Sequence, residues 1–443
     1  MTHDDREKRH SEAARGAARL IDSIPDKGRR SFLRIAMANG IAAPIALASL
    51  GSARAAKASE GELAAMPSTS VQNRSGVIVR DFADPYLELL RLLREGAEIE
   101  HGLMLQYLYC AFSVKDRYQA LVGYGAPIAN SVLGVAIQEM QHLGAVNRLL
   151  VALGGSPHLD RQDFPYEPDI YPFPFGLEPV SRTVLAKYAY VEGPGEIFTA
   201  GGQRSPEDEQ FSRNVLADIG GIERINHVGS LYRNVLDLLS EASGRPGFPL
   251  TPAEVEQWQS DLREIMHEGE HDHFEFFRQV YESRHPSFAS TGVENVWDLD
   301  PAHDAYPAHQ LPHNPTAFVG HPNQIASEDG LALAWLGNLH YWTSLCCLDY
   351  SYRYGDEGAM RVSTAQMMTG MWPLAAELPK YGAGVPFDTL SMGYAPGAGK
   401  EQARNFILAM AQEAQSYARN IEALLPARYD LNSANAVVET LGA

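Results

Sequence analysis

Apolar side chains recur at three- and four-residue steps along most of the chain, a spacing that predicts amphipathic helices. In the first two thirds of the chain the expected helices cover 82–113, 127–154, 207–242 and 252–283. Later in the chain they cover about 329–354, 359–379 and 399–425. Strand-like alternation is scarce and no repeat of solenoid period occurs, so the sequence predicts an all-α protein.

The segments between these helices divide the chain into regions. Residues 56–79 are small and polar and are interpreted as a linker, and residues 80–283 as a helical bundle. Residues 284–328 form a Pro/His-rich loop, whose five histidines lack tight metal-ligand spacing. The helices within 329–430 are expected to pack on the bundle as an additional layer.

The N-terminus carries a targeting pattern. Arg29 and Arg30 precede a short, Ala-rich apolar run at 35–50, and a small-x-small cleavage pattern ends at Ala55. This pattern resembles a bacterial twin-arginine signal peptide, and the apolar run is too short to favour a stable membrane span. We therefore expect residues 1–55 to be removed, the export machinery to be a partner, and the mature protein to be periplasmic or secreted.

Carboxylates and histidines lie on the apolar faces of the first two expected helices. Glu100 shares a stripe with Ala97 and Met104, and "IQEMQH" places Glu139 and His142 on the inward stripe of the next helix. A lone buried carboxylate costs several kcal/mol unless it is paired or ligated. These side chains therefore predict a common cation or a shared proton network.

The fourth helix contains two overlapping Glu-x-x-His pairs in "HEGEHDHFEFF", residues 267–277. Regular helical phase places Glu270 and His273 on the apolar face, and places Glu268 and His271 on the charged face. The prediction is therefore that Glu270 and His273 point inward and that the other pair is solvated.

Together these residues make up much of a di-iron carboxylate pattern. In that pattern two helices each contribute a Glu and two contribute Glu-x-x-His to the interior of a four-helix bundle. Carboxylates combined with two imidazoles suit iron, as one or two ions, with manganese as the alternative.

Several blocks of the chain resemble one family. The segments "AEIEHGLMLQYLYCAFS", "AIQEMQHLGAVNRLLVALGGSPHL", "HVGSLYRNV" and "HDHFEFFRQVY" are similar to the ferritin-like domain of iminophenyl-pyruvate dimer synthases, the violacein- and rebeccamycin-pathway type. The resemblance implies a ferritin-like four-helix bundle. It also implies that the residues of metal-ligand type are Glu100, Glu139, His142, Glu270 and His273.

One position departs from the family pattern. Where the family's third helix has a Glu, "VGSLY" has Ser230, and a hydroxyl is a poor substitute for a bridging carboxylate. His227 on the same helix and Glu192 in "YVEGPGE" are the alternatives that could complete the metal site. A site with one metal or none is equally compatible with the serine.

Three functions follow from these patterns. The first is an exported oxidoreductase that uses metal and O2 to oxidise or couple a small organic substrate, including an aromatic one. The second is a ferroxidase or metal-holding protein without an organic substrate, and the third is a metal-free scaffold. The net charge of −19 argues against nucleic acid and anionic membrane surfaces as partners. The sequence does not identify an oligomeric state.

Overall fold

The computed structural model describes residues 70–73, 76–123, 130–161, 173–198, 204–220, 228–390 and 399–442. These residues form an all-α structure with one short antiparallel hairpin, β1 (Ser70–Asn73) and β2 (Gly76–Val79). The hairpin lies in the segment predicted as a linker, which is therefore not without structure. The predicted signal peptide, 1–55, lies outside the described residues.

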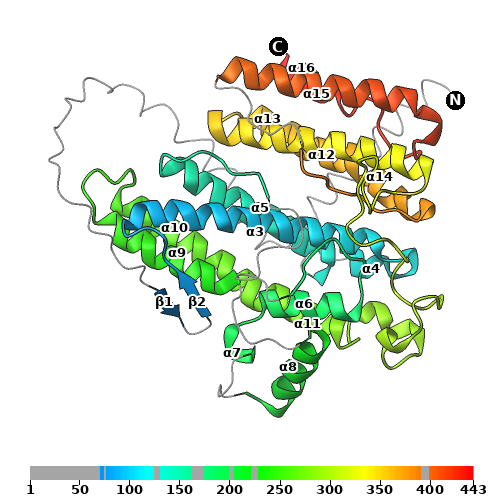
Figure 1. Ribbon diagram of the computed structural model, residues 1–443, viewed down its shortest axis with the longest axis horizontal. Helices are drawn as coiled ribbons and strands as arrows, with labels where there is room; N and C mark the ends of the chain where they lie inside the picture. Colours follow the sequence, from blue (N-terminus) through cyan, green and yellow to red (C-terminus); the bar gives the residue numbers. More distant parts are fainter. Residues whose placement is uncertain are drawn as a thin grey trace.

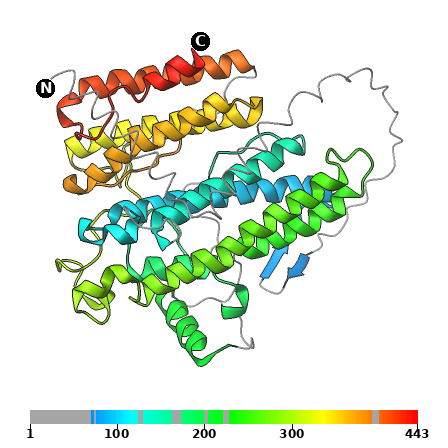
Figure 2. The same ribbon diagram turned by 180° about the vertical axis from the view of Figure 1, so that it is seen from behind.

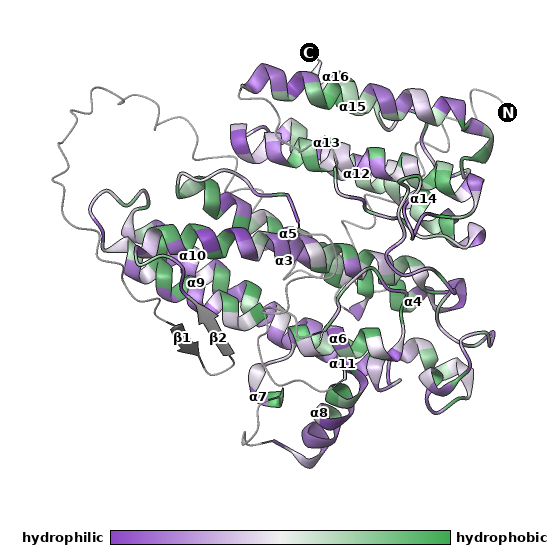
Figure 3. Ribbon diagram, in the orientation of Figure 1, coloured by the Kyte–Doolittle hydropathy of each residue, from purple (hydrophilic) through white to green (hydrophobic). Residues whose placement is uncertain are grey.

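A long buried helix, α3 (Pro85–Ser113), is the centre of the bundle. It packs against α5 (Val132–Ala152) and α9 (Val228–Ser243), and α9 packs in turn against α10 (Pro252–His267) (Figure 1). Every residue of α3 from 99 to 113 is buried. Hydrophilic residues nevertheless interrupt the hydrophobic colouring midway along α3 (Figure 3), so polar groups lie inside the bundle.

The third predicted helix, 207–242, is wrong as a single element. It divides into α8 (Pro206–Asp218) and α9, because Gly220 ends the first part with a φ of +89°, a conformation that favours glycine. The sequence analysis also missed α6 (Arg182–Glu192) and the short α7 (Gly195–Phe198). Helix α6 packs on α11 (Phe274–Tyr281).

The fourth predicted helix is continuous but not uniform. Between α10 and α11 it contains a π-turn (Glu268–His273), in which the Phe274 N–H donates to the Gly269 carbonyl five residues earlier. A π-turn contains wider hydrogen-bonded rings than an α-helix and therefore changes the direction in which side chains point. This change of phase falls on the overlapping Glu-x-x-His pairs.

The C-terminal helices form a further layer, as expected. Helix α12 (Glu328–Tyr354) packs on α13 (Glu357–Ala365) and α15 (Lys400–Asn420), and it contacts α5 of the bundle. A second π-turn (Gln366–Met371) joins α13 to α14 (Trp372–Glu377), and α16 (Asn435–Leu441) covers α13 and α15. Figure 2 shows this layer stacked along one side of the bundle.

The predicted loop, 284–328, wraps the end of α3. It contains two 3-10 turns, Pro286–Thr291 and Val296–Asp298, and the His309 N–H donates to the Ser113 carbonyl at 2.7 Å. Among the helices of the described ranges, none is long and apolar enough to cross a membrane.

Candidate metal centre

Five buried side chains from four segments converge inside the bundle. They form two groups of three, each with its candidate ligand atoms within 4.8 Å of one another. One group is Glu100, Glu139 and His142, and the other is Glu139, Glu192 and His273. Glu139 belongs to both groups, so its carboxylate lies between them. Helices α3, α5 and α6 and the first π-turn each contribute to the centre.

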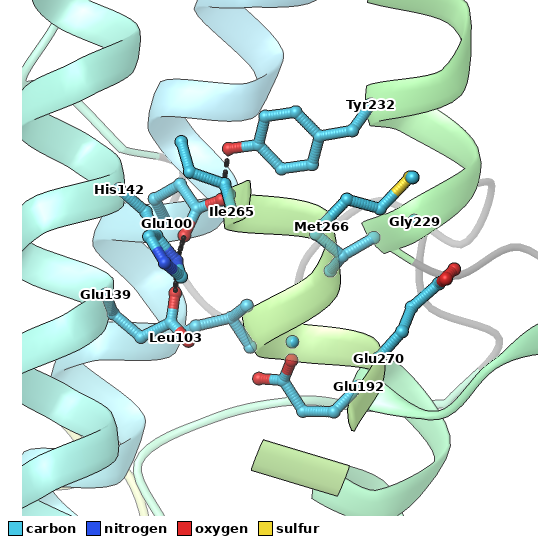
Figure 4. A pocket seen from close by; sticks show the side chains of 12 residues that line it. Glu100, Leu103, Glu139, His142, Glu192, Gly229, Tyr232, Ile265, Met266 and Glu270 are labelled. Carbon is cyan, nitrogen blue, oxygen red and sulfur yellow. Dashed lines mark hydrogen bonds and ion pairs between the residues drawn. The ribbon is translucent and has the colours of Figure 1, made fainter. Parts of the chain in front are cut away.

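The Nδ1 atoms of both histidines face the carboxylates. His142 Nδ1 lies 3.2 Å from Glu139 Oε2 and 3.5 Å from Glu100 Oε2. His273 Nδ1 lies 2.9 Å from Glu139 Oε1 and 3.5 Å from Glu192 Oε2. The two rings stack at 5.7 Å between centroids. Figure 4 shows Glu100, Glu139 and His142 turned toward one another.

The Nε2 atoms of the same histidines face away from the centre, toward other acceptors. His142 Nε2 lies 2.8 Å from Glu268 Oε2, and His273 Nε2 lies 3.2 Å from Gln138 Oε1. Each ring therefore has one nitrogen facing the carboxylates and one facing a supporting side chain.

Two buried tyrosines hold the two carboxylates that are not shared. The Tyr232 hydroxyl donates to Glu100 Oε1, and the Tyr107 hydroxyl donates to Glu192 Oε1. Burial, together with the facing carboxylates, raises the pKa of both phenols well above the usual value. Both hydroxyls therefore stay protonated and act as donors.

The carboxyls and imidazoles perturb one another strongly. Burial, and then the neighbouring Glu139, raises the pKa of Glu100 to about 8. Burial opposes ionisation of Glu139 as well, but the facing Glu100 carboxyl and the adjacent His142 outweigh that effect and lower its pKa. Burial also opposes protonation of His273, yet Glu192 and Glu139 raise its pKa to about 10. Without a metal, these groups would share protons.

The residues present fit a metal. Glu100 Oε2 and His273 Nδ1 are buried and lack a hydrogen-bond partner among the described residues. His273 Nδ1 is close to Glu139 but is not aligned for a hydrogen bond with it. Buried polar atoms are normally satisfied, and both of these atoms are aimed at the space that a cation would fill. Carboxylate oxygens with imidazole nitrogens suit iron or manganese.

The predicted site residues divide into three outcomes. The structure brings Glu100, Glu139, His142, Glu192 and His273 together. Glu270 belongs to neither three-residue group; it lines the pocket beside the centre and pairs with Arg233 at 2.5 Å. His227 lies outside the described residues, and Ser230 is buried on α9.

The π-turn sets the directions of the two overlapping Glu-x-x-His pairs. Regular helical phase places residues three or four apart on one face, whereas this turn presents Glu268 and His273, five apart, to α5. Glu268 is consequently not the solvated residue that was predicted. His271 does point outward, with 71% of its side chain exposed.

Sequence reasoning missed four residues around the centre: Tyr107, Gln138, Tyr232 and Glu268. Tyr107 had a usable signal, since it follows Glu100 by seven residues on the same helical stripe. Glu268 had none, because its direction depends on the π-turn.

A small pocket adjoins the centre. Its lining includes Glu100, Glu139, His142 and Glu192, with Tyr232 and Met266 above them (Figure 4). Its volume is about 10 Å³, close to the minimum for one water molecule. Within the described residues, the space beside the centre is therefore about the size of one water molecule.

Comparison with known proteins identifies the class of the bundle. Residues 93–249 match the ferritin-like family model, so this part of the chain is similar to ferritin-like domains. The matched range includes Glu100, Glu139, His142 and Glu192. The predicted all-α, ferritin-like fold class is thereby confirmed.

Two curated relatives are distantly similar. The dichlorochromopyrrolate synthase of Lentzea aerocolonigenes is 32% identical over 130 residues, which cover 24% of this chain and 13% of the relative. The 2-imino-3-(indol-3-yl)propanoate dimerase of Chromobacterium violaceum is 26% identical over 235 residues, which cover 44% of this chain and 23% of the relative. The chain therefore spans less than a quarter of the length of either relative.

One solved structure is also similar, a ferritin-like protein from Caulobacter vibrioides. Its match is 16% identical with a TM-score of 0.43, and it covers 69% of this chain and 99% of that chain.

Proposed function

We propose that the protein is an exported, metal-dependent oxidoreductase with a two-metal carboxylate centre. The observation that carries this proposal is the pair of three-residue groups that share Glu139. One shared carboxylate flanked by two carboxylate–histidine sets is an arrangement suited to two adjacent cations.

Each residue of the centre has a distinct part in this proposal. Glu100 and His142 would hold one ion, Glu192 and His273 the other, and Glu139 would bridge them. Bound iron would supply redox chemistry and Lewis acidity toward O2. Tyr232 and Tyr107 fix the outer carboxylates by hydrogen bonds, so those side chains stay in place. The surrounding apolar core excludes bulk water.

A small organic substrate, oxidised or coupled in an O2-linked reaction, is the first candidate. The supporting observation is the similarity to two proteins whose names describe a synthase and a dimerase of organic compounds. Their similarity extends over only part of each chain, so the specific reaction is not carried over.

Iron itself is the second candidate substrate, as in a ferroxidase. The observation that favours it is the pocket volume of about 10 Å³. The described lining leaves room for about one water molecule and not for an aromatic ring, unless the substrate binds outside the bundle or α9 and α10 separate.

Metal analysis followed by O2 uptake tests the proposal. Protein loaded anaerobically with Fe2+ and then desalted should retain up to two Fe per chain. On mixing with air, loaded protein should consume O2. Continued uptake on repeated Fe2+ additions alone would favour the ferroxidase, whereas uptake that requires an added aromatic amine or phenol would favour the organic oxidation. Protein that retains no iron and no manganese would contradict both the organic oxidation and the ferroxidase. The metal-free scaffold would then be the remaining function.

Export rests on the sequence pattern alone. Replacing Arg29 and Arg30 with lysine preserves the charge but removes the paired guanidinium groups. The double variant should accumulate as precursor in the cytoplasm, as measured by fractionation and mass of the mature chain. A variant with Lys27→Arg is the control, and export of both variants at the same level would rule out the twin-arginine route.

A further inference from the structure

Two helical segments support each other's histidines across the centre. His142 belongs to α5, and the acceptor for its Nε2 is Glu268 of the π-turn. His273 belongs to the π-turn, and the acceptor for its Nε2 is Gln138 of α5. Each segment therefore supplies one imidazole and the side chain that holds the other segment's imidazole.

The spacing of the residues allows this exchange. Gln138 and His142 are four residues apart on α5, and residues at that spacing lie on one face of an α-helix. Glu268 and His273 are five residues apart, the hydrogen-bond spacing of a π-turn. A regular α-helix at 268–273 would not present both residues to the same neighbour.

The geometry points to Glu268 and Gln138 as a reciprocal pair of positioning residues for the two candidate metal-binding histidines. This inference rests on the proposed two-metal centre. A hydrogen bond from Nε2–H fixes the tautomer and the ring direction, and so leaves the Nδ1 lone pair facing the carboxylates. Neither supporting residue touches the candidate ions.

The two supports differ in chemistry, so the two metal positions should differ in affinity. Glu268 offers a carboxylate at 2.8 Å, whereas Gln138 offers an amide oxygen at 3.2 Å. A charge-assisted hydrogen bond is shorter and stronger, and it increases the basicity of the imidazole. The position beside His142 should therefore fill first.

Anaerobic titration with Co2+ tests the pair, because visible ligand-field absorption reports the coordination of each ion. Wild-type protein should bind in two steps. Glu268→Ala should weaken the tighter step by about 10- to 100-fold, the usual effect of losing such a partner. Glu268→Gln keeps an acceptor oxygen and should recover part of the loss. Gln138→Glu should strengthen the weaker step and bring the two affinities closer.

His271→Gln is the matched control, since His271 lies in the same π-turn and points outward, with 71% of its side chain exposed. Its titration should match that of the wild type, and circular dichroism should show every variant folded. If wild-type protein binds two Co2+ ions while the Glu268 and Gln138 variants leave both steps and both spectra unchanged, the assignment is wrong but the centre stands. If the wild type binds no Co2+, the proposed centre fails, and the assignment with it.

Discussion

Two π-turns, one in the bundle and one in the C-terminal layer, each bring a polar side chain to a buried histidine on a neighbouring helix. In the bundle, Glu268 reaches His142 of α5. In the C-terminal layer, Gln366 reaches His340 of α12, with 2.8 Å between Gln366 Oε1 and His340 Nδ1. The local geometry is similar, and the surroundings of the two histidines are not.

Both ring nitrogens of His340 have neutral partners. His340 Nε2 lies 2.7 Å from the Tyr429 hydroxyl, and the Gln366 amide donates to the Ser433 carbonyl. Burial lowers the pKa of His340 to about 4, so the ring is neutral. This cluster holds α12, the second π-turn and the C-terminal segment together.

The cluster in the bundle has the opposite character. Several carboxylates face its two histidines, and Glu100 Oε2 and His273 Nδ1 lack hydrogen-bond partners within the described ranges. A buried polar cluster whose bonds are complete stabilises a fold, whereas one whose acceptors converge without partners predicts a ligand. The difference between the two clusters therefore separates a structural role from a metal-binding one.

The largest expected effect is at the shared carboxylate. Glu139→Gln removes the negative charge that belongs to both three-residue groups, so both metal positions should lose their ion. Metal analysis should fall from up to two Fe per chain to none. The matched control is Glu98→Gln, outside the centre, where Glu98 bonds His158. Full iron content in the Glu139 variant would contradict the metal-binding role that the comparison assigns to the cluster in the bundle.

The next largest effects come from a matched pair of His→Leu variants, which distinguish the structural role of one cluster from the metal-binding role of the other. His340→Leu leaves the buried Gln366 without one of its partners, a loss that costs roughly 1–3 kcal/mol in the free energy of unfolding. Its iron content should equal that of the wild type. His142→Leu should show the reverse pattern, with lost metal binding as the main effect. Chemical denaturation and metal analysis on both proteins measure the two effects. Loss of iron in the His340 variant would show that the clusters are coupled.

Much of the fold could be predicted from apolar periodicity. Helices α3, α5 and α12 fall close to their expected ranges, because long periodic stripes with clear start signals determine them. Helix α6 is too short for apolar periodicity to reveal it. Its start and stop residues are nevertheless in the sequence, because Ser181 caps its first turn and Gly193 ends it. The break between α8 and α9 was marked by the Gly220–Gly221 pair in the sequence.

The candidate site was predictable only where its helices are regular. Glu100, Glu139 and His142 lie on α-helical stripes, and the structure buries all three side chains close together. In the π-turn, regular helical phase does not give the side-chain directions, because a change in hydrogen-bond spacing rotates side chains without altering which residues are helical. Glu268, which was expected to be solvated, therefore contacts His142. Glu192 was an open alternative, since its placement required a helix that the pattern did not reveal.

The smallest expected effect comes from the glycines of the two π-turns. A Cβ at residue 269 would lie 3.0 Å from Glu192 Oε2, whereas a Cβ at residue 370 would lie 2.5 Å from His340 Nδ1. Gly269→Ala should therefore push the Glu192 carboxylate by a few tenths of an ångström and weaken the metal position beside His273 by about 10-fold. The position beside His142 should keep its affinity.

Gly370→Ala should instead lower the free energy of unfolding and leave both metal affinities unchanged, because its clash falls on a histidine that holds no ion. Calorimetric titration with Co2+ and urea denaturation of both variants measure the two effects. If Gly269→Ala weakens both metal steps equally, Glu192 does not belong to one position alone. The two positions would then be better described as one coupled site around Glu139, because a shift confined to one end of an uncoupled two-ion site cannot lower both affinities alike.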